Sequence, residues 1–153
     1  LPWVMGSVEV PVHPLLREHE LRHILVDSEA KAVITTRSWM GQNYPALLER
    51  LQPDLPNLQT VVVRGAKEGD GKLFYSLDEV MARGDSMQKV PVAADEMKRI
   101  TYTSGTTGIP KGVVHTWDRF FGLVRPAVAP RLSPKRQRRR DLNRTFFTIS
   151  HTE

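Results

Sequence analysis

The chain has 153 residues, a length that suits one domain with its own hydrophobic core. Its hydrophobic fraction of 40% and charged fraction of 25% are ordinary for a globular protein, and the absence of cysteine excludes disulfide bonds and thiolate metal sites. The net charge of +5 comes from one end of the chain, because residues 1–118 carry 13 basic and 15 acidic side chains whereas residues 119–153 carry 9 and 2.

Segments typical of strands and of helices alternate along the first 116 residues. Short apolar or alternating runs predict the strands, and apolar residues at helical spacing predict the helices. In chain order, we expect a strand at 8–12, a helix at 15–28, a strand at 32–35, a helix at 44–51 with Pro45 in its first turn, a strand at 58–63, a surface turn at 65–72, a helix at 76–84, and strands at 98–103 and 112–115. This order predicts an α/β fold, with a layered, mostly parallel sheet and flanking helices.

The helix expected at 76–84 has recognisable end signals. Ser76 suits the N-cap position, Glu79 lies at the capping-box position three residues later, and Gly84 is a typical stop. These residues predict a short helix that is capped at its start and ended by glycine.

Residues 102–112, which read YTSGTTGIPKG, are rich in glycine and in hydroxyl side chains. Gly105 and Gly108 permit positive φ angles and let backbone N–H groups converge on an anion. The hydroxyl donors and the positive charge come from Thr103, Ser104, Thr106, Thr107 and Lys111. This composition between two expected strands indicates a loop that binds a polyphosphate.

The loop differs from the phosphate loop of nucleotide hydrolases, whose pattern is G-x-x-x-x-G-K-[ST]. Gly105 and Lys111 have the required separation, but Pro110 replaces the second glycine and has no N–H to offer a phosphate. Gly112 replaces the hydroxyl residue that would bind Mg²⁺, and the next residues favour a strand rather than a helix. The loop therefore belongs to a different type.

The string YTSGTTGIPKG resembles the signature of the adenylate-forming superfamily, the AMP-dependent synthetases and ligases. The preceding VPVHPLLREHELRHILVDSEAKAVIT is similar to the segment before the loop in that superfamily, and REHEL is most like the acyl-CoA synthetases of fatty or alicyclic acids. The resemblance covers residues 5–124 and implies a partial AMP-binding (adenylation) domain at 1–124.

The resemblance also implies a reaction and a role for the loop. A small-molecule carboxylic acid would attack the α-phosphate of ATP, pyrophosphate would leave with Mg²⁺, and coenzyme A would take the acyl group from the acyl-adenylate. The residues implied to enclose and neutralise the β- and γ-phosphates are Thr103, Ser104, Gly105, Thr106, Thr107, Gly108 and Lys111. The implied function is an AMP-forming acid–thiol ligase, an acyl-CoA synthetase of fatty acid metabolism.

The sequence departs from the family pattern in several places. Trp117 stands where many members have histidine, and the pattern ends after about residue 124. The adenine pocket, the ribose-binding aspartate and the catalytic lysine of the small C-terminal domain have no counterpart in the sequence. We therefore expect a fragment that is inactive and only marginally folded by itself.

Residues 125–153 form a basic tail, with five lysines or arginines within 135–140. Its prolines and its lack of an amphipathic period predict a disordered or non-homologous segment, although FFTISHTE at 146–153 has some similarity to the next strand of the family. The basic run leaves open a non-catalytic nucleic-acid-binding protein. Since no binding module or aromatic interleaving accompanies the run, we expect no specific nucleic acid partner.

Residues 19–23, HELRH, fit the H-E-x-x-H pattern of zinc proteases. At about 100° per residue, His19 and His23 lie on the helix face opposite the apolar residues, so both are expected in solvent. Glu49 is the third ligand that the sequence could offer, and nothing else in the sequence supports a metal site. We expect no metal site, but a zinc hydrolase stays open as an alternative function.

No run approaches the roughly 18 apolar residues of a membrane span, and no secretory signal is visible. These observations predict a cytoplasmic protein without a transmembrane segment.

Overall fold

The computed structural model describes residues 6–66, 73–83, 90–103, 108–122 and 145–149. Within these ranges, seven strands form one sheet in the order β6-β5-β2-β9-β1-β7-β8. Its members are β1 (Val8–Val12), β2 (Ala32–Thr36), β5 (Thr60–Arg64), β6 (Phe74–Ser76), β7 (Met97–Thr103), β8 (Lys111–Thr116) and β9 (Thr145–Ile149). Only β7 and β8 pair antiparallel in this described sheet, so the predicted α/β fold with a mostly parallel sheet is confirmed.

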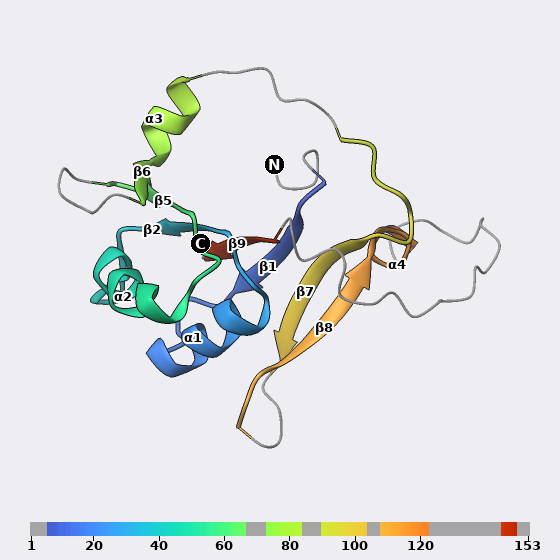
Figure 1. Cartoon of the computed structure of the whole chain (residues 1–153), viewed down its shortest axis with the longest axis horizontal. Coiled ribbons are helices and arrows are strands. Elements are labelled where there is room, and N and C mark those ends of the chain that lie inside the picture. Colours follow the sequence, from blue (N-terminus) through green and yellow to red (C-terminus); the bar gives the residue numbers. More distant parts are fainter. Residues whose placement is uncertain (1–5, 67–72, 84–89, 104–107, 123–144, 150–153) are drawn as a thin grey trace.

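Helices flank the sheet, as Figure 1 shows. α1 (Glu18–Asp27) and α2 (Tyr44–Leu51) lie together on one side, and α3 (Leu77–Ala82) lies on the other. The 3-10 helix η2 (Gln52–Asp54) extends α2, α4 (Trp117–Gly122) follows β8, and β3 (Ser38–Trp39) pairs with β4 (Gln42–Asn43). No helix in the part of the chain that the structure describes has both the length and the apolar character needed to cross a membrane.

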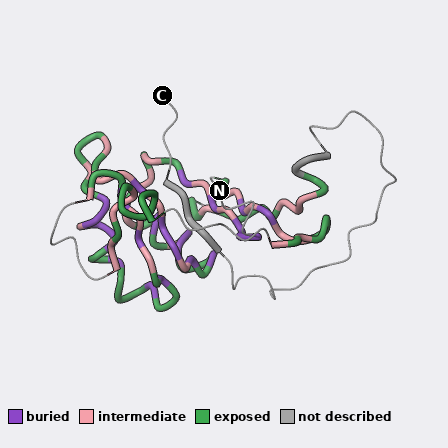
Figure 2. Tube along the Cα trace, turned by 90° about the horizontal axis from the view of Figure 1, so that it is seen from above, coloured by how far each residue is buried: buried purple, intermediate pink, exposed green. Residues whose placement is uncertain are grey.

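The core lies where α1 and α2 pack on the sheet. Leu21, Ile24 and Leu25 of α1 are each 1% exposed, as their helical spacing predicted. From α2 the core receives Tyr44, Leu47, Leu48 and Leu51. Figure 2 shows the buried segments gathered in this part of the molecule. Burial of these apolar side chains is the main force that fixes both helices against the strands.

α1 begins three residues later than the sequence predicted. Residues 13–16 form a turn instead, in which the N–H of Leu16 donates to the carbonyl of His13 at 3.1 Å. The backbone N–H of Arg17 then donates to the carboxylate of Glu20 at 2.6 Å. This bond satisfies one of the donors that every helix start leaves unpaired, and it sets the first residue of the helix.

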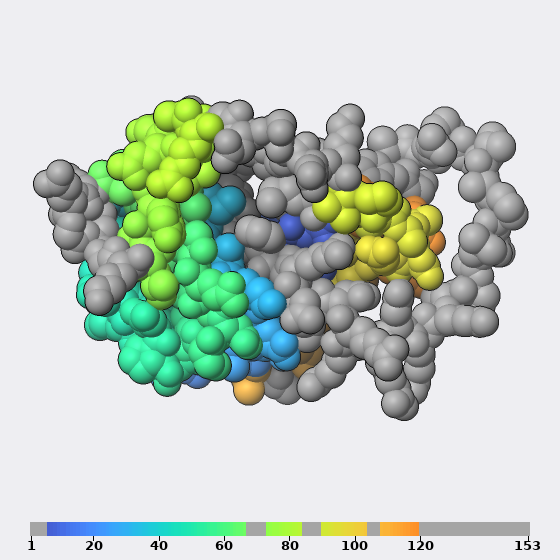
Figure 3. Space-filling view, turned by 45° about the horizontal axis from the view of Figure 1, so that its top comes forward, coloured from blue at the N-terminus to red at the C-terminus, as the bar shows by residue number. Residues whose placement is uncertain are grey.

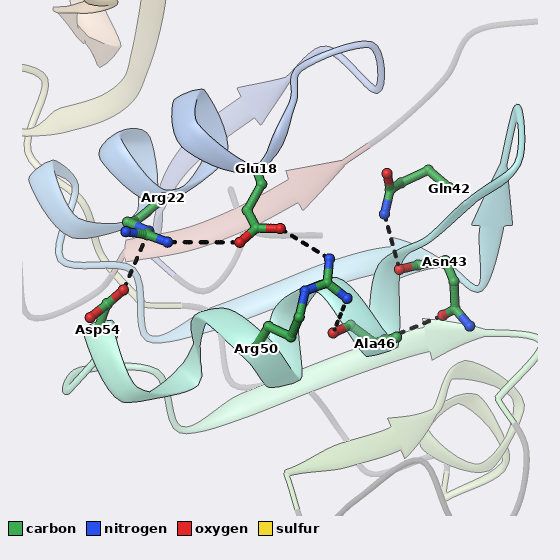
Figure 4. Close-up of polar contacts among 7 residues, drawn as sticks. All are labelled: Glu18, Arg22, Gln42, Asn43, Ala46, Arg50 and Asp54. Atoms are coloured by element: carbon green, nitrogen blue, oxygen red, sulfur yellow. Dashed lines mark hydrogen bonds and ion pairs between the residues drawn. The ribbon is translucent and has the colours of Figure 1, made fainter.

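A network of charged side chains joins α1 to α2 and η2 (Figure 4). Glu18 contacts Arg22 at 3.7 Å and Arg50 at 3.0 Å, and Arg22 contacts Asp54 at 3.3 Å. All four side chains are exposed, so each pair contributes only about 0–1 kcal/mol to stability. The network therefore orients the two helices more than it stabilises them.

The start of α3 differs from the prediction. Ser76 occupies the N-cap position, but its side chain makes no capping hydrogen bond, so the predicted capping box with Glu79 is wrong. Ser76 is also the last residue of β6 and pairs with Val63 of β5, and this pairing sets its backbone instead. Gly84 and residues 67–72 of the predicted turn lie outside the described residues.

β9 lies in the middle of the sheet, where it pairs in parallel with β1 and with β2. Its five residues fall within 125–153, so the structure differs there from the predicted disordered tail and agrees with the similarity of FFTISHTE to a further family strand. The sequence TFFTI explains the difference, because β-branched and aromatic residues favour strands. Residues 125–144 and 150–153 lie outside the described residues.

β7 and β8 form the edge of the sheet that is furthest from β6. On the face shown in Figure 3, α3 and the segment leading into β7 stand apart, with atoms of the β1 region visible between them. The β7–β8 hairpin and α3 therefore lie at opposite ends of the sheet.

Shortening Ile24 to valine should lower the free energy of unfolding by about 1 kcal/mol, because it removes a methylene group from a packed core. Urea unfolding followed by circular dichroism measures this change. Ile109→Val removes the same group from a side chain that is 52% exposed, and it should change the free energy by less than about 0.5 kcal/mol. Equal effects of the two changes would contradict the packing of α1 on the sheet.

Candidate functional site

The predicted phosphate loop connects β7 to β8. The two strands pair antiparallel from Met97 opposite Thr116 to Thr103 opposite Lys111. The expected strands on both sides of the loop are therefore confirmed. β7 begins one residue earlier than predicted, and β8 is one residue longer than predicted at each end. Thr103 and Lys111 are the last pair of the ladder, so backbone hydrogen bonding fixes their positions on either side of the loop entrance.

The structure describes three of the seven predicted site residues. Thr103 and Lys111 are both exposed, and they face the solvent at the loop entrance. The other four, Ser104, Gly105, Thr106 and Thr107, lie outside the described residues.

Gly108 has the positive φ angle that the sequence predicted, at 80°. This left-handed backbone conformation costs other residues roughly 1–2 kcal/mol because of their Cβ atom. A Cβ added at Gly108 would meet nothing within 4 Å. Glycine is therefore favoured here by the backbone conformation and not by a lack of space for a side chain.

Gly112 makes room for the aromatic ring of Tyr102, its partner across the ladder. A Cβ on Gly112 would lie 3.0 Å from Ile100 Cγ2, 3.2 Å from Tyr102 Cζ and 3.3 Å from Tyr102 Cε1. These separations are shorter than ordinary van der Waals contact. The absence of a side chain at Gly112 therefore lets the Tyr102 ring lie close to the backbone of β8.

Helix α1 contacts both strands beside the loop. The hydroxyl of Tyr102 donates to the carboxylate of Asp27 at 2.6 Å, and Nε2 of His23 lies 2.9 Å from the carbonyl oxygen of Pro110. A carbonyl can only accept, so Nε2 carries the proton in this bond. The rings of His23 and Tyr102 also meet edge to face, with centroids 6.5 Å apart and planes at 86°.

The sequence did not predict these contacts. His19 is exposed, as expected, but His23 is partly buried against Pro110, so the prediction that both histidines face solvent is wrong for His23. Helical periodicity identifies the face turned away from the core, but it does not reveal that a hairpin 75 to 87 residues later packs on that face. The available signal was the polar pair His23 and Asp27, one helical turn apart.

The zinc hydrolase hypothesis gains no support. In the described part of the chain, no three or more His, Asp or Glu side chains are grouped so that they could hold a metal ion. A cavity of about 390 Å³ lies along α1, and its lining consists of His19, Arg22, His23, Val26 and Asp27. The lining includes none of the three described loop residues, but it includes His23 and Asp27, so the cavity adjoins the contacts between α1 and the hairpin.

Charged residues fix the base of the hairpin to the rest of the sheet. Arg99 of β7 donates to Glu9 of β1 through Nη2 at 2.7 Å and Nε at 3.1 Å. Lys98 is fully buried, with its ammonium 5.5 Å from the ring centroid of Trp117. Burial is the first cause that lowers the pKa of Lys98, the positive charge of Arg99 lowers it further, and Glu9 acts in the opposite direction.

The fold and the hairpin together define the class: an α/β domain that presents a glycine- and hydroxyl-rich loop, with lysine at its exit, beside a mostly parallel sheet. The sequence model of the AMP-binding enzyme family matches this chain over residues 3–143. The chain therefore belongs to the AMP-binding enzyme family, within the adenylate-forming superfamily. The match continues past residue 124, where the sequence pattern was expected to end.

Individual relatives agree with this membership. The acetyl-coenzyme A synthetase of Bacillus subtilis (strain 168) is 34% identical over 116 residues, covering 74% of this chain and 19% of the relative. The medium-chain fatty-acid–CoA ligase of Escherichia coli (strain K12) is 33% identical over 122 residues, covering 79% of this chain and 20% of the relative. The crystal structure of the anthranilate CoA ligase AuaEII in complex with anthranoyl-AMP matches with a TM-score of 0.60 at 28% identity, covering 74% of this chain and 21% of that one. The chain thus spans about a fifth of the length of these relatives.

Tyr102 should make the protein less stable at alkaline pH. Burial, followed by the hydrogen bond and the negative charge of Asp27, raises the pKa of Tyr102 well above its ordinary value. The unfolded chain loses this proton near pH 10 while the folded chain keeps it, so stability falls as the pH rises above about 10. Tyr102→Phe should therefore weaken the pH dependence of the urea midpoint between about pH 9 and 11. An unchanged dependence would show that folding does not raise the pKa of Tyr102.

Proposed function

We propose that this chain supplies the phosphate-binding part of an ATP-dependent ligase, which activates a carboxylic acid as an acyl-adenylate and transfers the acyl group to coenzyme A. The observation that carries the proposal is the pairing of Thr103 with Lys111 at the entrance of the loop, in a chain of the AMP-binding family. The CoA ligases among its relatives favour coenzyme A as the acceptor. ATP, a small acid and coenzyme A are cytoplasmic metabolites, which suits the compartment that the sequence predicted.

The described residues fit an anionic polyphosphate. Lys111 offers an exposed ammonium group, and a charge-assisted bond from it to a phosphate oxygen is stronger than a bond between neutral groups. Thr103 offers a hydroxyl from the opposite strand, and the open left-handed turn at Gly108 leaves space for an anion. In the proposal, Ser104, Gly105, Thr106 and Thr107 complete the enclosure of the β- and γ-phosphates.

The proposed task of the loop is to hold the leaving group. When a carboxylate attacks the α-phosphate of ATP, negative charge builds up on the departing pyrophosphate. Donors that are already in place stabilise this charge without reorganising during the reaction. Mg²⁺ bound to phosphate oxygens would add charge neutralisation, and we assign no residue of this chain to it.

Lys111→Ala should weaken the binding of magnesium pyrophosphate to the chain by about fivefold to tenfold, which corresponds to the loss of about 1–1.4 kcal/mol of charge-assisted bonding. The affinity can be measured by titrating the ¹⁵N-labelled chain and following the amide signals of Gly108 and Gly112. Arg83→Ala removes one exposed positive charge from the end of α3 and serves as the matched control. Equal losses for both variants, or amide shifts that avoid the hairpin, would refute the proposal.

The 153-residue chain by itself should form no acyl-adenylate, because the proposal gives it the phosphate-binding part and not the residues that hold the acid and the adenine. Incubation with MgATP, hydroxylamine and either acetate or decanoate tests this, since hydroxylamine traps an acyl-adenylate as the hydroxamate. Hydroxamate formation by the chain, above that of the Lys111→Ala variant, would show that its share of the reaction is larger than proposed.

A further inference from the structure

We propose that His23 is a positioning residue for the phosphate loop: His23 holds the carbonyl of Pro110 and thereby sets the direction of Lys111. This inference rests on the proposed function, because it names what positions that site. It gives the second histidine of the HELRH sequence a role that involves no metal.

The first step concerns the peptide unit between Pro110 and Lys111. Nε2 of His23 donates to the Pro110 carbonyl over 2.9 Å. The peptide group is planar and trans, so the N–H of Lys111 points in the opposite direction to that carbonyl. The proline ring also fixes the φ angle on the other side of the carbonyl. A single hydrogen bond from α1 therefore orients the backbone from which the Lys111 side chain departs.

The second step concerns the other strand of the hairpin. Asp27 lies four residues after His23, so the two side chains are neighbours on one face of α1. Asp27 accepts the hydroxyl of Tyr102 at 2.6 Å, one residue before Thr103. The same helix face thus contacts Tyr102 near the end of β7 and Pro110, the residue directly before β8. The two bonds fix the entrance of the loop from both sides.

The third step is that α1 is a rigid reference. Leu21, Ile24 and Leu25 anchor the helix in the core, and Glu18 joins it to α2 through Arg50. The hairpin by itself is less constrained, because within the described sheet β8 has β7 as its only neighbour, and Val113 and Val114 are each 45% exposed. The hydrogen bonds from α1 therefore fix the position of the loop entrance relative to the body of the domain.

Two substitutions separate the hydrogen bond from the packing of the imidazole ring. His23→Phe keeps an aromatic ring beside Tyr102 but has no donor for Pro110. His23→Gln keeps an N–H donor at a similar reach but loses the ring. His19→Ala, one turn earlier at an exposed position that also lines the α1 cavity, is the control.

The experiment combines amide hydrogen exchange with titration by magnesium pyrophosphate. In His23→Phe, exchange of those amides at the start of β8 that bond to β7 should become about fivefold faster, and the affinity for pyrophosphate should fall about fivefold, the effect of losing one ordinary hydrogen bond. Amides of the β2–β5 ladder, such as those of Ile34 and Val62, should keep their exchange rates. His23→Gln and His19→Ala should both stay within twofold of the original chain.

Three outcomes would overturn the inference. His23→Phe could leave the amides at the start of β8 and the affinity unchanged, or His23→Gln could fail to restore them. Exchange could also accelerate equally in every ladder, which would make the role of His23 purely structural. Should His23→Phe unfold the chain, Asp27→Asn combined with Tyr102→Phe releases the other strand of the hairpin, and the inference then requires faster exchange at Thr103. If the unaltered chain binds no pyrophosphate, the proposed function fails, while the exchange measurements still decide whether His23 holds the hairpin.

Discussion

The antiparallel ladder between β7 and β8 is the constraint on which the candidate site depends. Its final pair places an exposed hydroxyl, Thr103, directly opposite an exposed ammonium group, Lys111. A slip of one residue would turn the side chains of the shifted strand to the other face of the hairpin, so Thr103 and Lys111 would no longer lie opposite each other. Gly112 protects the register, because any larger residue would meet the ring of Tyr102 and the side chain of Ile100. The spacing of the loop sequence thus serves the strands as well as the ligand that we propose.

An edge hairpin needs attachments to hold such a register in one place. At its base, Arg99 bonds Glu9 on the neighbouring strand, and Lys98 packs over Trp117. Near the loop, Asp27 of α1 bonds Tyr102 of β7, and His23 bonds Pro110, the residue directly before β8. The hairpin is therefore fixed at both ends by charged or polar side chains, whereas apolar packing fixes the body of the sheet. This division suits the proposed binding of a charged ligand by the loop, because polar attachments at the loop entrance need no apolar cover there.

Much of this arrangement could be predicted from the sequence. Runs such as TVVVR and VEVPV, and the spacing of Leu21, Ile24 and Leu25, predicted the strands and the helix that build the core, because local periodicity reports which face is buried. The loop was found because its glycines and hydroxyls are consecutive in the chain. The signals failed where distant segments meet: Ser76 is set by strand pairing rather than by capping, and β9 reaches the middle of the sheet across a long segment with no periodic pattern. For the same reason, no local pattern could place His23 against Pro110.

The HELRH sequence shows why a short motif needs its surroundings. Residues four apart on a helix lie on one face, so this spacing serves any partner that lies along the helix, whether a metal ion or a strand. A metal site requires a third ligand to converge on the two histidines, and the described residues place none there. A hairpin requires only that successive turns of the helix meet residues on both sides of its end, and His23 and Asp27 satisfy that condition with Pro110 and Tyr102. The apolar face of α1 builds the core and its polar face positions the loop, so the helix connects the most stable part of the domain to the part that we assign to the nucleotide.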